Sequence, residues 1–138
     1  MSGTAPRACI AVGAVVGAIA VATGAFGAHG LKHVLDAAGQ GANWETASRY
    51  AAVHALAIVA CGLAAATPGS EAARRTLATA AACFGGGTLL FSGLLWTIAV
   101  TNIRVLGAIV PIGGSLLIAG WVLLALGVGR DEVHVLPR

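Results

Sequence analysis

The feature that most constrains the fold of this chain is the absence of charged side chains from long stretches of its sequence. No Asp, Glu, Lys or Arg occurs in residues 8–28, 50–66, 76–103 or 105–129. Each run approaches or exceeds the ~20 residues that a helix needs to cross the hydrocarbon core of a bilayer. The sequence therefore predicts an all-α integral membrane protein, a four-helix bundle with spans at about 8–28, 46–66, 76–101 and 105–128.

Composition supports this interpretation and excludes other classes of protein. Charged residues make up 9% of the chain and hydrophobic residues 58%, whereas soluble domains carry roughly 25% charged residues. The basic residues behind the net charge of +3 are scattered, whereas a nucleic-acid-binding face would cluster them. The three cysteines lie far apart in apolar runs, in the pattern of neither a disulfide framework nor a zinc site. We therefore expect no nucleic-acid partner and no metal.

Three local signals predict how the spans begin and are joined. Apolar residues in the stretch 31–38 recur at helical spacing opposite polar ones, which predicts a short amphipathic helix in the membrane interface between spans one and two. Asn43 is predicted to cap the second span and Ser70 the third, since both residue types favour that position. Pro111, inside the first two turns of the fourth span, predicts a kink or a local opening there.

Glycine is frequent in the predicted spans, and several glycines align on one face of their helix. In lipid, small residues let two helices approach closely, because packing rather than hydrophobicity drives their association. We therefore expect the following helix-packing positions: Gly13, Gly17, Gly24, Gly86, Gly93, Gly113 and Gly120.

Four spans place both termini on one side of the membrane. That side carries Arg7, Arg74, Arg75, Arg130 and Arg138, and the opposite side carries Lys32, Arg49 and Arg104. Because basic residues are more frequent in cytoplasmic segments, this bias predicts cytoplasmic termini. The same arrangement puts most of the histidine, tryptophan and proline residues of the spans in the outer half of the membrane.

His54 is the strongest candidate for a functional residue in that outer half, because an ionisable side chain is costly to bury unpaired within a span. Tyr50, Ser92 or a carbonyl freed near Pro111 would satisfy its imidazole in a purely structural role. The alternative is a ligand-binding site, for which His29 at the membrane edge is a second polar anchor. The tentative ligand-binding residues are therefore His29, His54, Tyr50, Ser92 and Pro111.

Templates for catalysis and for cofactor binding are not matched. All five acidic residues lie in loops or in the tail, so no pair of carboxylates lies within a span, and the glycines at 85–87 lack the lysine of a phosphate-binding loop. His29 and His54 supply the minimum for a bis-histidine haem, but no arginine cluster accompanies them. A proton relay usually contains an acid. We expect no enzyme activity and no cofactor, and a haem or proton carrier is the least favoured alternative.

Several segments together resemble a known family. They are Gly-Ala-Phe-Gly-Ala-His-Gly-Leu at 24–31, Trp44 to Leu56 with its Tyr50 and His54, Leu-Phe-Ser-Gly at 90–93, Pro-Ile-Gly-Gly at 111–114 and Gly-Trp at 120–121. The chain resembles the YgdD-like small bacterial membrane proteins, catalogued as domain of unknown function 423. The resemblance covers nearly the whole chain and implies a four-span protein of the bacterial inner membrane, without implying an activity.

Two departures from the family pattern remove hydroxyl groups. The family usually shows Ser-Gly-Ser-Leu-Tyr where this chain has Ser-Gly-Leu-Leu-Trp at 92–96, and a threonine commonly stands where this chain has Val110. Both changes argue against a fixed polar network that does chemistry.

The favoured function is a non-enzymatic accessory or assembly subunit that packs in the lipid bilayer against another membrane protein or in a homo-oligomer. The alternative is a lipid-binding or small-molecule-binding module built on His54 and His29.

Overall fold

The computed structural model describes residues 4–132, with side chains described for residues 4–129. Within this range the chain is helical, without a strand: α1 (Thr4–Ala28), α2 (Lys32–Ala38), α3 (Gly41–Ala66), α4 (Glu71–Thr88), the π-helical η1 (Leu89–Gly93), α5 (Leu94–Thr101), the 3₁₀-helical η2 (Arg104–Ala108) and α6 (Val110–Glu132). Four stretches are long and apolar enough to cross a membrane, namely Thr4–Ala28, Gly41–Ala66, Glu71–Thr101 and Arg104–Gly129. The prediction of an all-α, four-span membrane protein is confirmed.

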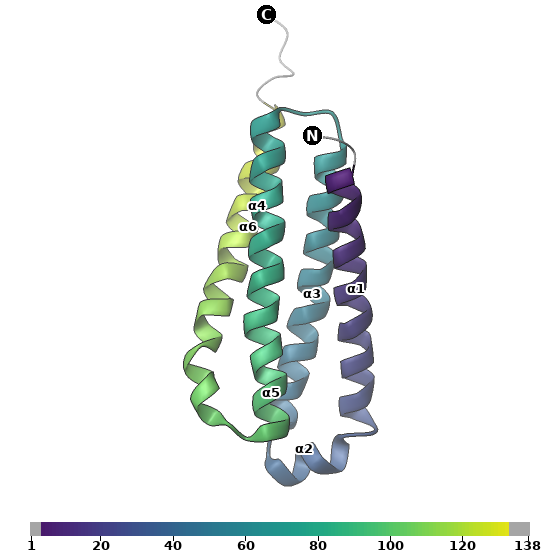
Figure 1. The fold of residues 1–138 in the computed structure, drawn as a ribbon, viewed down its shortest axis with the longest axis vertical. Helices are drawn as coiled ribbons and strands as arrows, with labels where there is room; N and C mark the ends of the chain where they lie inside the picture. Colours follow the sequence, from purple (N-terminus) through teal and green to yellow (C-terminus); the bar gives the residue numbers. More distant parts are fainter. Residues whose placement is uncertain (1–3, 133–138) are drawn as a thin grey trace, which may run out of the picture.

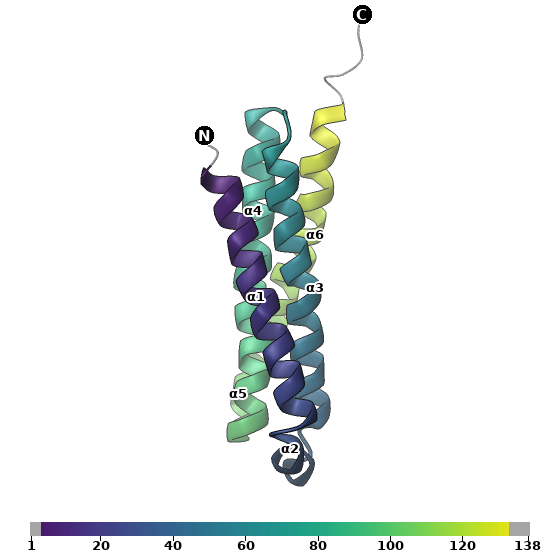
Figure 2. The ribbon, with the colours of Figure 1, turned by 90° about the vertical axis from the view of Figure 1, so that its right-hand side faces the viewer.

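The four membrane-length helical stretches run alternately up and down, and α2 lies across one end of the bundle (Figure 1). Their packing order is α1 on α3, α3 on α4, and α4 on α6. Figure 2 shows the same stretches from the side, with α1 in front. The helices α3 and α4 therefore form the centre of the bundle, and α1 and α6 are its outer members.

The junction between α2 and α3 differs from the predicted one. Gly39 adopts a left-handed conformation (φ 64°) at the end of α2, and its N–H donates to the carbonyl groups of Leu35 and Asp36. The next helix then begins at Gly41 with Gln40 as its N-cap residue, so the prediction that Asn43 caps the second span is wrong. The Asn43 amide instead donates to Gln40 Oε1 at 2.7 Å, within the first turn of α3. The second span thus begins two residues before Asn43, directly after the turn at Gly39.

The start of α4 agrees with the prediction. The Ser70 hydroxyl accepts a hydrogen bond from the backbone N–H of Ala73 at 3.1 Å, which satisfies one of the free donors of the first turn. The rod then continues through η1 into α5. The π-helical turn was not predicted, because one widened turn leaves no clear mark on the hydrophobic period of the sequence.

The fourth span is interrupted before Pro111 rather than kinked after it. The chain makes a 3₁₀ turn at Arg104–Ala108, and α6 then begins at Val110. Pro111 is thus in the first turn of α6, where its missing N–H costs no helical hydrogen bond and its fixed φ suits the helix start. The predicted kink within the span is replaced by this break.

Glycines allow the closest helix contacts. A Cβ on Gly13 would lie 2.8 Å from the Ala55 carbonyl oxygen, one on Gly113 would lie 2.6 Å from the Phe91 nitrogen, and one on Gly120 would lie 2.7 Å from the Phe84 ring. The other four glycines named from the sequence have space for a Cβ, with nearest atoms at 3.7–4.0 Å: Gly17, Gly24, Gly86 and Gly93. Four further glycines are equally tight: Gly27, Gly62, Gly87 and Gly127.

Candidate functional site

His54 lies on the buried face of α3, and both of its ring nitrogens are occupied by hydrogen bonds. Nδ1 is 2.7 Å from the carbonyl oxygen of Tyr50, one turn earlier. Nε2 is 3.3 Å from Nε1 of Trp121, which belongs to α6. The helices α3 and α6 otherwise have few contacts, so this hydrogen bond joins the second span to the fourth.

These two partners determine the tautomer of His54. A carbonyl oxygen can only accept a hydrogen bond and an indole N–H can only donate one. The proton therefore lies on Nδ1, which donates to Tyr50, while the lone pair of Nε2 accepts from Trp121. In this state the imidazole is neutral and has no donor or acceptor left for a ligand. The structure thus supports the structural role of His54.

Aromatic rings surround the imidazole. The His54 ring is 5.8 Å from that of Tyr50, 5.6 Å from that of Phe84 and 6.1 Å from that of Trp121, measured between centroids. The Tyr50 ring also stacks on Phe91 at 4.7 Å, and Phe84 meets Trp121 edge-on at 5.2 Å. We call these five residues the His54 cluster. Because its members come from α3, α4, η1 and α6, it ties three spans together.

Ser92 does not bond to His54, although the sequence placed both in the outer half. Ser92 is fully buried in η1, and among the described residues its hydroxyl has no hydrogen-bond partner. The hydroxyl of Thr88, also buried, has none either. Two unpaired hydroxyls thus lie about one turn apart, at and just before the π-helical turn. A buried polar atom without a hydrogen-bond partner lowers the stability of the fold.

The remaining two candidates lie apart from His54. Pro111 is exposed on the first turn of α6, and His29 is exposed in the turn after α1. Gly27 of α1 lies against Trp44 of α3, so His29 is near the level of Trp44. His54 is ten residues deeper along α3, which at 1.5 Å per residue is about 15 Å. Of the five predicted residues, the structure therefore brings together only Tyr50 and His54.

A second polar cluster lies at the end of the bundle near α2, and sequence analysis missed most of it. The Trp44 indole donates to the Thr23 carbonyl at 2.7 Å, and the Trp96 indole donates to the Ser48 hydroxyl at 3.1 Å. Nearby, the buried Gln40 amide donates to Asn102 Oδ1 at 3.3 Å. The available signal in the sequence was that an indole N–H which is at least partly buried needs an acceptor.

The acidic residues with described side chains pair with basic residues rather than with one another. The described acidic side chains are exposed, and each pairs with a basic residue one turn away in its own helix: Asp36 with Lys32, Glu45 with Arg49 and Glu71 with Arg75. Within the part of the chain that the structure describes, no group of three His, Cys, Asp or Glu side chains could hold a metal ion. The polar contacts of the His54 cluster and of the cluster near α2 instead join neighbouring spans.

Comparison with known proteins places the chain in a family. The sequence model described as "Protein of unknown function (DUF423)" matches residues 23–114, a range that contains the octapeptide at 24–31 and the Pro-Ile-Gly-Gly at 111–114.

Curated relatives agree with that match. The chain is 41% identical to a UPF0382 membrane protein of Staphylococcus saprophyticus over 86% of this chain and 93% of the relative. It is 39% identical to a UPF0382 membrane protein of Staphylococcus haemolyticus over 85% and 91%. No solved structure matches significantly. The chain belongs to the DUF423 family of membrane proteins.

Proposed function

We propose that this protein is a non-enzymatic accessory subunit that packs in the bilayer against another membrane protein. The observation that carries this proposal is a second small-residue face on α1. The alanines of this face are all exposed and recur every three or four residues: Ala11, Ala14, Ala18, Ala22 and Ala25. We call this face the α1 alanine face.

The α1 alanine face is separate from the contact with α3. The side of α1 that packs on α3 carries the buried Gly13 and Ala20, and at 3.6 residues per turn the exposed alanines point away from it. Only 11% of the most apolar window of α1 is buried within the protein, against 39% for α3. A lipid-facing helix has no need of small residues, whereas a helix–helix contact in the membrane favours them.

The interior supports a non-catalytic role. The ring nitrogens of His54 are both committed to the protein, and the described acids are exposed and paired. The alternative, a ligand site that uses His54 and His29 together, would have to bridge a depth of about 15 Å along the bundle. A haem shared by these two histidines meets the same obstacle, and a proton path through His54 would require its hydrogen bonds to break.

Purification at native expression level in a mild detergent, followed by mass measurement, tests the proposal. We expect the protein to co-purify with another membrane protein, and Ala18→Phe to reduce the recovered partner at least ~fivefold, as an overpacked contact costing ~1 kcal/mol would. The matched control is Ala119→Phe, on an exposed position of α6, which should retain the partner. A lone monomer from the wild-type protein, or equal recovery with both variants, would refute the proposal.

For location, we propose the bacterial inner membrane with cytoplasmic termini. Arg7, Arg74 and Arg75 lie at the terminal end of the bundle, and Lys32, Arg49 and Arg104 lie at the other end. Arg75, Lys32 and Arg49 each pair with an acid, which leaves two arginines at the terminal end and one at the other end without an acidic partner among the described residues. The side chains of Arg130 and Arg138, which add to the sequence bias, lie outside the described residues. Positive charge retained near the ends of spans favours the cytoplasmic side.

A reporter fused after residue 138 tests this orientation. Green fluorescent protein at that position should fluoresce and alkaline phosphatase should be inactive, because the first needs a cytoplasmic and the second a periplasmic location. The reverse pair of results would mean that the termini face outward.

A further inference from the structure

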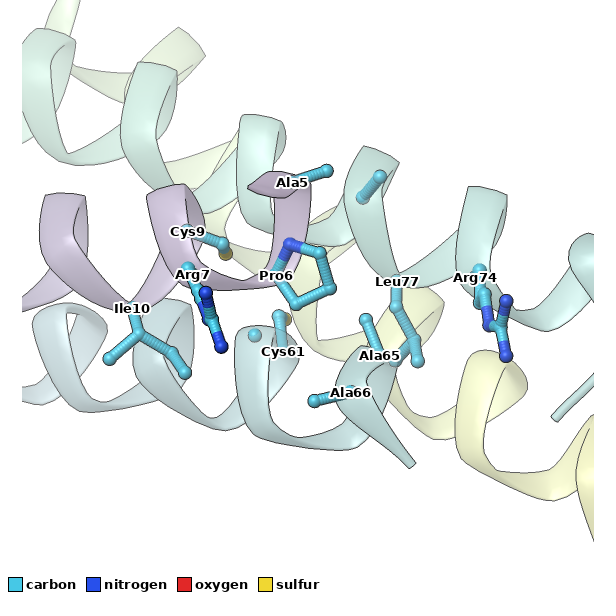
Figure 3. Close-up of a pocket in the computed structure, with 12 residues that line it drawn as sticks. Ala5, Pro6, Arg7, Cys9, Ile10, Cys61, Ala65, Ala66, Arg74 and Leu77 are labelled. Atoms are coloured by element: carbon cyan, nitrogen blue, oxygen red, sulfur yellow. The ribbon is translucent and has the colours of Figure 1, made fainter. Parts of the chain in front are cut away.

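A cavity of about 360 Å³ lies at the terminal end of the bundle, among the start of α1, the end of α3 and the start of α4. We call it the terminal cavity. Its volume is within the range of ~300–1,000 Å³ that is usual for small-molecule sites. Residues of all three helices line it, and Figure 3 shows Arg7 of α1, Cys61 of α3 and Arg74 of α4 around the same cavity.

Most of the lining is apolar. Apart from two arginines, the terminal cavity is lined by small and apolar residues, among them Cys9, Ile10, Cys61, Ala65 and Leu77. Among the residues with described side chains, none of those that line the cavity is acidic. Such a wall suits a hydrocarbon chain and gives no reason for a free, hydrated ion to enter.

The two arginines, Arg7 and Arg74, lie on opposite flanks of this apolar wall (Figure 3). Among the arginines with described side chains, Arg49 and Arg75 pair with acids and Arg104 donates to Asn102. Arg7 and Arg74 are the pair left without such a partner among the described residues.

Arg74 is the more informative of the two. Its Nε atom is buried and has no hydrogen-bond acceptor in the described part of the chain. A buried donor of a charged group that lacks an acceptor is costly, so an external acceptor would relieve it. Two guanidinium groups that flank one cavity, with no acid among its described lining residues, are complementary to a phosphate, which arginine binds through paired N–H donors.

We propose that the terminal cavity binds an anionic phospholipid. The phosphate group lies between Arg7 and Arg74 at the membrane surface, and the start of an acyl chain lies against the apolar wall. Basic pockets between membrane helices are a known means of holding anionic headgroups. The apolar lining distinguishes this ligand from free phosphate, and the net negative charge distinguishes it from zwitterionic lipids. This site is independent of the α1 alanine face, so either proposal stands if the other fails.

Native mass spectrometry of the purified protein tests the site, with phosphatidylglycerol or phosphatidylcholine added at equal concentration. We expect phosphatidylglycerol to remain bound and phosphatidylcholine to be lost. Arg74→Gln and Arg7→Gln should each weaken phosphatidylglycerol binding roughly tenfold, as the loss of a charge-assisted hydrogen bond would. Arg75→Gln is the matched control, because Arg75 is adjacent in sequence, exposed and paired with Glu71, and it should bind like the wild type.

A second variant keeps the test valid if removal of Arg74 disturbs folding. Ala65→Phe would fill the apolar wall while both arginines remain, and we expect it to weaken phosphatidylglycerol binding while the melting temperature without added lipid stays close to that of the wild type. Inorganic phosphate at millimolar concentration should not displace the lipid. Displacement by phosphate, equal retention of the two lipids, or equal binding by the Arg74 and Arg75 variants would overturn the proposal.

Discussion

Replacing Gly113 with alanine is expected to destabilise the protein by about 2–3 kcal/mol, the upper part of the range for overpacking. A Cβ at this position would lie 2.6 Å from the Phe91 nitrogen and 3.0 Å from the Gly87 carbonyl oxygen. Both are backbone atoms, which cannot rotate away as a side chain can, so α6 would have to move off the rod formed by α4 and η1. Unfolding in detergent, followed by steric trapping or by a dodecyl sulfate titration, measures the change.

The adjacent glycine provides the control for this prediction. A Cβ on Gly114 would lie 3.8 Å from the nearest atoms, those of the Phe91 ring, which is ordinary van der Waals contact. Gly114→Ala should therefore lower the stability by no more than ~0.5 kcal/mol. It could raise the stability by up to ~1 kcal/mol, because alanine favours the helix. If the two variants are equally stable, the close contact between α6 and η1 does not exist as described.

Replacing His54 with leucine is expected to lower the stability by about 1–3 kcal/mol without the loss of a bound ligand. The change removes the acceptor of the Trp121 N–H and three ring contacts. Hydrogen bonds between membrane helices average ~0.6 kcal/mol and reach ~1.7 kcal/mol, and an aromatic contact adds ~0.5–1.5 kcal/mol. The leucine side chain keeps part of the packing with the three rings, so the expected loss is smaller than the sum of these values. The free energy of unfolding of the variant in detergent measures the effect.

A double-mutant cycle with Trp121→Phe separates the hydrogen bond from general packing. Because a phenylalanine ring has no N–H to donate, the second change should cost less in the His54→Leu background than in the wild type, by about 1 kcal/mol. Strict additivity would show that the bond between Trp121 and His54 contributes nothing. If His54→Leu left stability unchanged but removed a co-purified small molecule, the structural role of His54 would be refuted.

The octapeptide at 24–31 shows how far residue patterns carry in this chain. It lies within residues 23–114, the range that the family model matches. The pattern emphasised Gly24 and His29, yet a Cβ on Gly24 would lie 3.9 Å from its nearest neighbour and His29 is exposed. The close contact is at Gly27, where the Trp44 indole occupies the space that a Cβ would need. That Trp44 is the residue in contact with Gly27 could be found only from the packing of α1 on α3.

The His54 cluster was predictable in part. An imidazole inside an uncharged run had to find partners, and Tyr50, one turn away in the same helix, was the nearest one that the sequence offered. Trp121 is distant in the chain, so no local pattern pairs it with His54. Its role depends on how α6 is rotated against α3 and α4, and many small contacts together determine that rotation.

The sequence by itself determined the number of spans, their approximate limits, the cap at Ser70 and the family. Each of these follows from local properties, since a bilayer selects for uncharged runs of a certain length and a helix start selects for certain side chains. Only the tertiary structure decided which glycines are tight, which partner fixes the His54 tautomer, and that Arg7 and Arg74 flank one cavity. These features depend on the rotation and depth of each helix against its neighbours, and in lipid those are set by the shapes of whole helix faces rather than by any single residue.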